Sequence, residues 1–200
     1  MLSEQVLAHP RISDIYFEYL FGCYSVARAS VPLMEATRER AASMTGDPAS
    51  TALASYLEKH IAEETGHDEW FLEDLGALGY DRGRLVTRPP PISLATMVGT
   101  QYYWVLHYHP VTILAFLIAV ESSPPSRAVI DELMKLTGHG PDSFRTLIEH
   151  ADLDEHHEAE LYQLLDELPL TEEQSSVLGL NAMQTVHLMA ASLQELLDAF

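Results

Sequence analysis

Residues 60–70, HIAEETGHDEW, place two histidines and four acidic residues within three turns of an expected helix. His60, Glu64 and His67 are at positions i, i+4 and i+7, which lie within about 60° of one another around a helix. Glu64 and His67 also form the Glu-x-x-His pair that carboxylate-bridged di-iron bundles use. Glu63 lies on the flank of this face. Because a lone Glu-x-x-His often occurs by chance, the stretch indicates a metal site only if other ligands join it.

A second stretch, EHADLDEHHEAEL at residues 149–161, repeats the same ligand spacing. His150, Asp154 and His157 are at positions i, i+4 and i+7, so a helix would place all three within about 60° of one another. His156 would point away from that face. On its own this stripe is equally compatible with an exposed polar face, so it supports a metal site only in combination with the first stretch.

Glu121 ends the most apolar run of the sequence, VTILAFLIAVE at residues 111–121. One interpretation is a glutamate that emerges into solvent at the following SSPP turn. The other is a buried carboxylate, which is costly unless it is paired or bound to a metal. A helix C-terminus also favours cations over anions. We therefore expect a positive group close to Glu121.

Together the three stretches provide a mixed set of imidazole and carboxylate ligands without a thiolate. Such a set suits Fe(II) or Mn(II), with zinc as an alternative. Six ligands exceed what one catalytic ion with open positions requires, so two carboxylate-bridged ions are the better match. The candidate metal ligands are Glu64, His67, Glu121, His150, Asp154 and His157, with Glu63 and His60 in reserve for the first position.

Helical periodicity dominates the chain, and no stretch alternates convincingly as a strand would. The expected fold class is all-α, with about seven helices. Pro32 should kink or divide the first helix, Asp47 or Ser50 should cap the second, and Thr171 should cap the last. The segment at 80–91, YDRGRLVTRPPP, is expected to be a loop. The helices are expected at about 11–45, 47–79, 93–107, 111–121, 131–137, 142–168 and 171–199.

The 200 residues fit one helical domain spanning 1–200, with 47% hydrophobic and 20% charged residues as in ordinary globular proteins. A formal charge of −19 argues against nucleic acid or an anionic membrane as a partner, because phosphate binding needs a basic surface. The longest apolar run is about half of the ~20 residues that a membrane span needs. With a single cysteine and no signal-peptide pattern, we expect a cytoplasmic protein. The oligomeric state is open, and a homodimer is one expectation.

The order of these motifs resembles the haem-oxygenase-like di-iron oxidase and oxygenase superfamily. The resemblance covers roughly residues 20 to 170 and includes EExGHDEW, a glutamate after an apolar helix some fifty residues later, and His-x3-Asp-x2-His. It implies a haem-oxygenase-like bundle that holds two non-haem iron ions at the six candidate ligands. It also implies O2 as co-substrate and the oxidation of a small molecule, amino-acid-like or fatty-acid-like, in specialised metabolism.

The substrate pocket gives a weaker signal than the ligands. Tyr103 and His107 belong to an aromatic stretch, GTQYYWVLHYHP at 99–110, which we interpret as a pocket wall, with core packing as the alternative. Glu35 is a candidate to orient a ligand imidazole. Basic residues are scarce, and Arg28 is our candidate partner for a substrate carboxylate.

Three other functions compete with this interpretation. Haem oxygenase itself would need basic residues for the haem propionates, which this acidic chain offers in small number. A thiaminase-like hydrolase would use a cysteine nucleophile, but Cys23 lies in LFGCYS, an apolar setting typical of an inert packed thiol. A non-catalytic helical metal-binding or interaction protein would expose His150 and His157.

Overall fold

Helices make up all the regular structure in the part of the chain that the computed structural model describes. That part is the backbone of residues 2–122 and 125–200, with the side chains of 5–122, 125–151 and 157–200. It contains ten α-helices and two short 3-10 helices. In chain order they are α1 (Leu2–Leu7), α2 (Ile12–Ser43), α3 (Pro48–Glu64), α4 (His67–Ala77), α5 (Arg82–Thr87), α6 (Ile92–His107), η1 (Pro110–Thr112), α7 (Ile113–Glu121), α8 (Arg127–Thr137), η2 (Pro141–Ser143), α9 (Arg145–Glu167) and α10 (Glu172–Asp198).

The all-α prediction is confirmed, but the expected count of about seven helices is too low. Three differences account for the ten that the described residues form. A short α1 precedes the first expected helix. The segment at 80–91, expected to be a loop, contains α5, which Asp81 caps by accepting a hydrogen bond from the Arg84 backbone N–H. The second expected helix is two helices, α3 and α4.

The expected helix ends agree better with the structure than the expected number of helices. Asp47, not Ser50, caps α3, because its carboxylate accepts a hydrogen bond from the Ser50 N–H at 3.0 Å. Thr171 begins α10 with a reciprocal capping box that includes Gln174. Pro32 lies inside α2, which is one helix from Ile12 to Ser43, so of the two expected effects the division does not occur.

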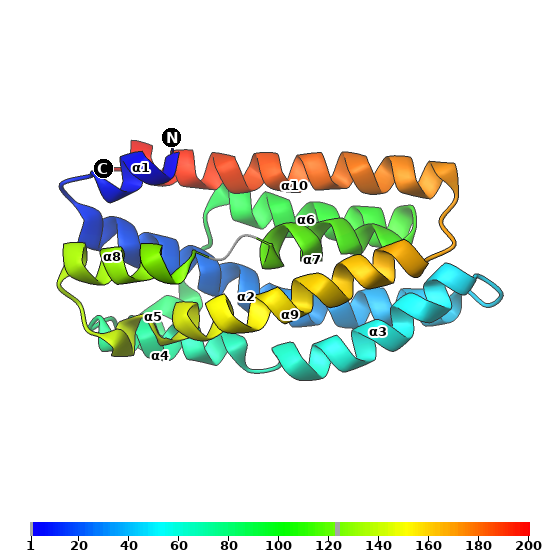
Figure 1. Cartoon of the computed structure of the whole chain (residues 1–200), viewed down its shortest axis with the longest axis horizontal. Coiled ribbons are helices and arrows are strands. Elements are labelled where there is room, and N and C mark those ends of the chain that lie inside the picture. The colour runs from blue at the N-terminus through cyan, green and yellow to red at the C-terminus, as the bar shows by residue number, and fades with distance from the viewer. Residues whose placement is uncertain (1, 123–124) are drawn as a thin grey trace.

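The long helices run side by side along one axis of the molecule (Figure 1). α10 lies along one edge with α6 and α7 next to it, and α3, α4 and α9 lie on the opposite side. The two chain ends lie near each other at one end of the bundle. None of the described helices combines the length and hydropathy needed to cross a bilayer.

Two hydrophobic clusters form the core. One includes Leu57 of α3 and Leu114 of α7. The other includes Phe71 of α4 and Phe144, the residue before α9. The candidate ligands at 60–67 lie in sequence between Leu57 and Phe71, so they come where the two clusters meet. The apolar packing on both sides holds the helices that carry them.

Gly66 separates α3 from α4. Its backbone φ of 97° lies in the left-handed region, which only glycine adopts without strain. Glu64 is the last residue of α3 and His67 the first residue of α4. The expected single stripe of His60, Glu64 and His67 is therefore wrong, because the chain changes direction between the second and third of these residues.

A buried carboxylate fixes α4 against the start of α9. Asp74 is 1% exposed and accepts a hydrogen bond from the backbone N–H of Thr146 at 2.8 Å. That N–H is one of the first in α9, which has no partner within its own helix. Asp74 lies two turns after His67, and Thr146 lies one turn before His150. This contact therefore sets the distance between two candidate ligands.

α10 is joined to its neighbours by hydrogen bonds of a buried side chain, Asn181. Asn181 donates to the Gln101 side chain at 2.7 Å and to the Thr112 carbonyl at 2.8 Å. Gln101 belongs to α6, and Thr112 ends η1. These hydrogen bonds replace the bonds to water that the buried polar groups lose on folding. Because they join α10 to α6 and to η1, the residue before α7 included, they align α10 with its neighbours.

Gly66→Ala tests whether the break between α3 and α4 depends on the left-handed conformation. No atom would obstruct the new Cβ, so the cost is backbone strain of about 1–2 kcal/mol. Gly99→Ala is the matched control, since Gly99 lies inside α6 with open space around it. It should stabilise the chain by about 0.5–1 kcal/mol. Urea unfolding measures both, and equal effects of the two substitutions would contradict the assigned role of Gly66.

Asp74→Ala should destabilise the chain by about 1–3 kcal/mol, because it leaves the Thr146 N–H buried without an acceptor. Glu73→Ala is the control. It removes a surface ion pair with Arg145 and should change the free energy of unfolding by at most about 1 kcal/mol. Chemical denaturation gives both values. A loss for Asp74→Ala no larger than for its neighbour would show that Asp74 does not anchor α9.

Asp74 should also give the stability a defined pH dependence. Burial raises the pKa of Asp74 despite the hydrogen bond from Thr146. The folded chain then binds a proton more tightly than the unfolded chain, so stability falls as the pH rises from about 4 through the raised pKa. Asp74→Asn keeps an acceptor for Thr146 and should remove this part of the dependence. Thermal unfolding of both proteins between pH 4 and 7 measures it, and parallel curves would contradict the expectation.

Candidate metal centre

One group of possible metal ligands combines three helices. His60 of α3, Glu121 of α7 and His157 of α9 each offer a ligand atom, all within 4.8 Å of one another, and all three residues are buried. His60 Nε2 lies 2.9 Å from Glu121 Oε1, and His157 Nδ1 lies 3.7 Å from Glu121 Oε2. The sequence led us to expect a positive group near Glu121, and the groups found there are these two imidazoles.

A second group lies next to the first. Glu64, His67 and His150 also offer ligand atoms within 4.8 Å of one another. Glu64 Oε2 is 3.0 Å from His67 Nδ1, and the rings of His67 and His150 have centroids 4.9 Å apart at 78°. These residues come from the end of α3, the start of α4 and the first half of α9. The break at Gly66 therefore lies inside the second group.

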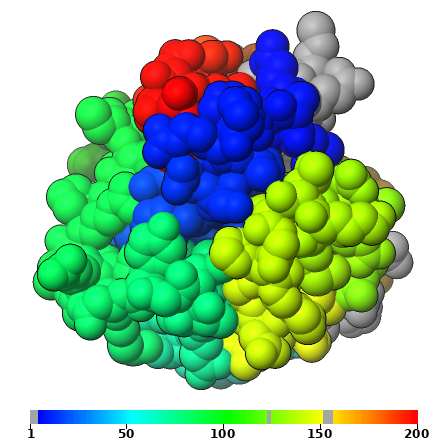
Figure 2. Space-filling model, turned by 90° about the vertical axis from the view of Figure 1, so that its left-hand side faces the viewer, coloured from blue at the N-terminus to red at the C-terminus, as the bar shows by residue number. Residues whose placement is uncertain are grey.

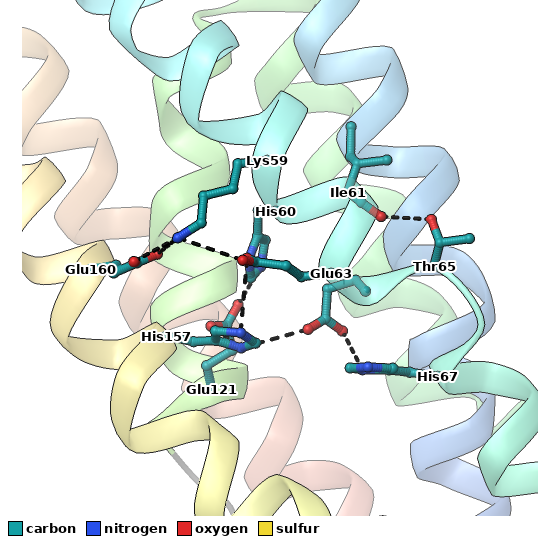
Figure 3. A network of polar contacts seen from close by, with 10 residues as sticks. Lys59, His60, Ile61, Glu63, Thr65, His67, Glu121, His157 and Glu160 are labelled. Carbon is teal, nitrogen blue, oxygen red and sulfur yellow. Dashed lines mark hydrogen bonds and ion pairs between the residues drawn. The ribbon is translucent and has the colours of Figure 1, made fainter.

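The carboxylate of Glu64 lies between the two groups. Its Oε2 faces His67, while its Oε1 is 3.6 Å from His157 Nδ1 in the first group. Glu63 lies at the edge, with Oε2 3.7 Å from His60 Nδ1 and Lys59 Nζ 3.5 Å from its Oε1. Figure 3 shows the side chains from α3, α7 and α9 that converge here, with His67 approaching from α4. Glu64 therefore directs one carboxylate oxygen toward each group.

A hydrogen bond to the backbone determines which nitrogen of His150 is available to an ion. His150 Nδ1 lies 2.8 Å from the carbonyl oxygen of Thr146. A carbonyl only accepts, so Nδ1 carries the proton, and Nε2 remains as the ligand atom. This is the usual way in which a neighbouring group orients a metal-binding imidazole.

Opposing electrostatic effects act on these side chains. Burial alone would lower the pKa of His60, but the hydrogen bond and charge of Glu121 outweigh it and raise the pKa. Burial alone would raise the pKa of Glu64, but His67 outweighs it and lowers the pKa. Burial lowers the pKa of His150, which favours the neutral imidazole that binds metal ions.

The donor set fits iron. Within the described residues, His60 Nδ1, Glu63 Oε2 and Glu121 Oε2 are buried without a hydrogen-bond partner, although buried polar atoms normally have one. All three belong to this one place, and all are atom types that bind Fe(II). A bound iron ion would give a partner to those of these atoms that ligate it.

The structure brings together five of the six predicted ligands, namely Glu64, His67, Glu121, His150 and His157. The sixth, Asp154, lies outside the residues whose side chains are described. His60, a reserve in the prediction, takes part in the first group, and the other reserve, Glu63, lies beside it. His60 and Glu64 are therefore not alternatives for one position, because each belongs to a different group.

A cavity of about 810 Å³ reaches the centre, and His60, Glu64, Glu121 and His150 form part of its wall. Tyr103 and His107, predicted as pocket residues, are exposed on the outer side of α6 instead. Residues 99–107 of this aromatic stretch form more than two turns of α6, so part of the stretch must face outward.

Two further predicted pocket residues lie elsewhere, and one residue was missed. Glu35 is exposed on α2, and Arg28, whose Nη1 donates to the Val86 carbonyl at 3.4 Å, is not among the residues of the cavity wall. Arg88 is in that wall. Its position in the loop before three prolines gave no periodic signal from which to predict it.

Cys23 also contributes to the cavity wall. Burial raises the pKa of its thiol to about 11, so the thiol is neutral near pH 7 and a poor nucleophile. His157 is buried and His150 is partly buried, whereas a non-catalytic surface stripe would expose both. Neither observation favours the alternatives that depend on a reactive cysteine or on exposed histidines.

Solved structures similar to this chain have the haem-oxygenase-like fold. A domain of unknown function with a heme oxygenase-like fold from Shewanella denitrificans has a TM-score of 0.82 and 20% identity, over 99% of this chain and 84% of its own. A TenA homolog from Pseudomonas syringae pv. tomato has a TM-score of 0.74 and 14% identity, over 98% of this chain and 84% of its own. Identities this low show the shared fold alone. Comparison with curated protein sequences gives no significant match.

The family to which the chain is assigned agrees with the site. Residues 24–189 match the family described as iron-containing redox enzymes, and this range includes all the residues of both ligand groups. Iron is the metal that the family implies, and the imidazole and carboxylate set is suited to it. With its fold, its ligand groups and the family match in agreement, the chain belongs to the family of iron-containing redox enzymes.

Proposed function

We propose that this chain is a non-haem di-iron oxidase or oxygenase that activates O2 and oxidises a small organic molecule. The observation that carries the proposal is the position of Glu64, with one carboxylate oxygen toward each of two ligand groups. A single ion would need only one group of three ligands, whereas here a second group of three lies next to the same carboxylate. Carboxylate-bridged pairs of ions are the known use of such a set in helical bundles.

In this proposal each ligand has a distinct part. His60, Glu121 and His157 would hold one ion, His67 and His150 would hold the other, and Glu64 would be shared between the two. Asp154, the sixth candidate ligand, stays a prediction from the sequence spacing. Bound iron supplies the electrons and the open coordination positions that O2 reduction requires.

The protein around the ligands controls the reaction in two ways. The Thr146 carbonyl fixes the tautomer of His150, so the unprotonated Nε2 of His150 is the nitrogen that is free to bind the ion. The apolar wall of the cavity, which includes Phe116, Leu117 and Val120, excludes bulk water from the centre. An oxidising species formed there would then meet the bound substrate before it meets solvent.

The metal stoichiometry tests the proposed division of the ligands. The wild-type chain should bind about two Fe(II) ions in an anaerobic titration. His60→Ala should bind about one tightly, because it removes one ligand from the first group, and Glu64→Ala should weaken both sites. His107→Ala is the control, since this exposed histidine lies outside both groups. One ion in the wild type, or an unchanged stoichiometry in Glu64→Ala, would contradict the bridged pair.

Reaction with O2 tests the catalytic part of the proposal. The Fe(II)-loaded chain, mixed with O2 in a stopped-flow spectrometer, should oxidise its iron faster than Fe(II) in buffer and give a transient visible absorption. Glu64→Ala should lose this reaction. The measurement is repeated with a panel of small carboxylic acids and amines, because some centres react only when substrate is bound. Tight iron without any O2 reaction across the panel would favour the alternative of a non-catalytic metal-binding protein.

A further inference from the structure

The cavity at the metal centre extends far along the bundle. Its wall includes residues of α2 from Glu18 to Met34, which are about 24 Å apart along the helix at 1.5 Å per residue. It also includes residues of α10 from Val186 to Leu196, about 15 Å apart by the same measure. The space is therefore elongated and parallel to the long helices.

Between its ends the cavity is lined by apolar side chains. Examples from four helices are Val26, Leu94, Met97, Leu117 and Leu193. A polar substrate would lose its hydration there without replacement hydrogen bonds. A hydrocarbon body would gain roughly 25 cal/mol for each Å² of apolar surface removed from water. The middle of the cavity therefore favours an alkyl or aryl chain.

Charged groups reappear at the end remote from the metal ligands. Arg88 and Glu18 contribute to the wall there, and Arg88 is its only lysine or arginine among the described residues. Arg88 Nη2 lies 2.9 and 2.7 Å from the two carboxylate oxygens of Glu18. The guanidinium also lies over the ring of Phe21, with Cζ 4.3 Å from its centroid. Arg88 is thus held in place by a charge on one side and an aromatic face on another.

The pair between Arg88 and Glu18 leaves part of the guanidinium available. A single nitrogen of Arg88 serves both oxygens of Glu18, so the pair is not the two-nitrogen fork that arginine and carboxylate can form. Nη1 and Nε have no hydrogen-bond partner in the described part of the chain. The other acid at this end, Glu195, already accepts from Ser93 Oγ at 2.8 Å. The available group is therefore a donor for an anion.

The two polar ends are separated by a definite distance. α2 and α3 are antiparallel neighbours joined by residues 44–47, so His60 and Glu64 lie level with about residues 27–31 of α2. Arg88 contacts α2 at Phe17 to Phe21. The separation is about 15 Å. An extended chain of about a dozen bonds, at ~1.2 Å of advance per bond, covers it.

We propose that the substrate is an elongated carboxylic acid with a mainly hydrocarbon body, bound with its carboxylate on Arg88 and its opposite end at the metal centre. An ammonium group at the same end would face Arg88 as a like charge. The orientation keeps the acid group away from the ligands, so the atoms that are oxidised lie at the other end of the molecule. What happens at the metal rests on the proposed function, whereas binding at Arg88 rests on the cavity alone.

The elements that carry this end of the cavity meet at one end of the bundle, where the start of α2, α5 with the start of α6, and the end of α10 come together (Figure 2). Arg88 belongs to the connection between α5 and α6, and its side chain is 38% exposed. An acid that arrives from solvent with its hydrocarbon end first would thus finish with its carboxylate at the surface end. That order avoids carrying a charge through the apolar middle.

Binding to the metal-free full-length chain tests the assignment of Arg88. Calorimetric titrations would compare dodecanoate, dodecylammonium and dodecanol, and dodecanoate should bind most tightly. Arg88→Gln should raise the Kd of dodecanoate by at least about tenfold, which is the effect expected when a hydrogen bond to a charged group is lost. Arg88→Lys should give an intermediate affinity, and Glu18→Gln should strengthen binding, because it frees Arg88 from its competitor.

Arg82→Gln is the matched control for this titration. Arg82 also pairs with a glutamate, Glu69, at 2.6 Å, but it lies outside the cavity wall. The substitution should leave dodecanoate affinity unchanged. Tighter binding of dodecylammonium than of dodecanoate, or equal effects of Arg82→Gln and Arg88→Gln, would overturn the proposal. The thermal unfolding temperature of each variant shows whether it is folded.

A second measurement tests the orientation. Dodecanoate labelled with ¹³C at the carboxylate or at the terminal methyl is bound to the chain loaded with Mn(II), a paramagnetic substitute for iron. The methyl carbon should relax faster than the carboxylate carbon, and the reverse order would overturn the proposed orientation. If Mn(II) does not bind while Arg88→Gln still weakens the binding of dodecanoate, the proposed metal centre is contradicted and the proposed carboxylate site is supported. If Mn(II) binds and Arg88→Gln does not change the binding of dodecanoate, the proposed carboxylate site is contradicted and the proposed metal centre is supported.

Discussion

The carboxylates of Glu121, which is buried, and of Glu64, which is partly buried, lie between α3, α4, α7 and α9, and the side chains of these helices offset the cost of placing two negative charges there. Each carboxylate lies within 4 Å of imidazole nitrogens from other helices. Imidazoles alone leave several of the buried atoms without partners, so the arrangement is complete only with cations. The packing of α3, α7 and α9 around one point follows from this requirement as much as from their apolar faces.

Backbone features set the geometry of these groups. The left-handed Gly66 separates two helices so that Glu64 and His67 face each other across a turn. The contact from Asp74 to Thr146 then ties α4 to α9, and Thr146 in turn orients His150. The orientation of the ligands therefore depends on helix packing, and helix packing depends in turn on the local backbone conformation. A change at Gly66 or Asp74 would act on the metal ligands without touching them.

The sequence allowed the ligand types to be predicted better than their grouping. Spacing of three and four residues identified His150 and His157 on one helix, and the apolar run before Glu121 identified a buried acid. It could not place His60 and Glu64 in separate groups, because both lie on α3 and their partners come from helices far away in the sequence. It also missed the break between Glu64 and His67, because a single glycine does not by itself predict one. The all-α class also followed from periodicity, whereas the short α1 and α5 were missed because six residues are too few to show one.

The cavity was beyond such reasoning. A cavity wall collects single residues from distant segments, so neither Arg88 nor Glu195 carries a local signal. Tyr103 and His107 looked suitable because aromatic residues are common in pockets, but their position on α6 turns them outward. Residue type indicates which chemistry is available, and only the packing of helices decides which side chains meet.

Iron binding at these carboxylates would also link the lifetime of the protein in a cell to the supply of iron. An ion that binds only the folded chain stabilises it by an amount that grows with the free metal concentration, about 2.7 kcal/mol at a hundredfold excess over Kd. When iron is scarce, a larger fraction of molecules is unfolded at any moment and open to proteases. Cellular abundance would then follow iron availability without a dedicated sensor, because the helices around the ligands would be least stable without metal.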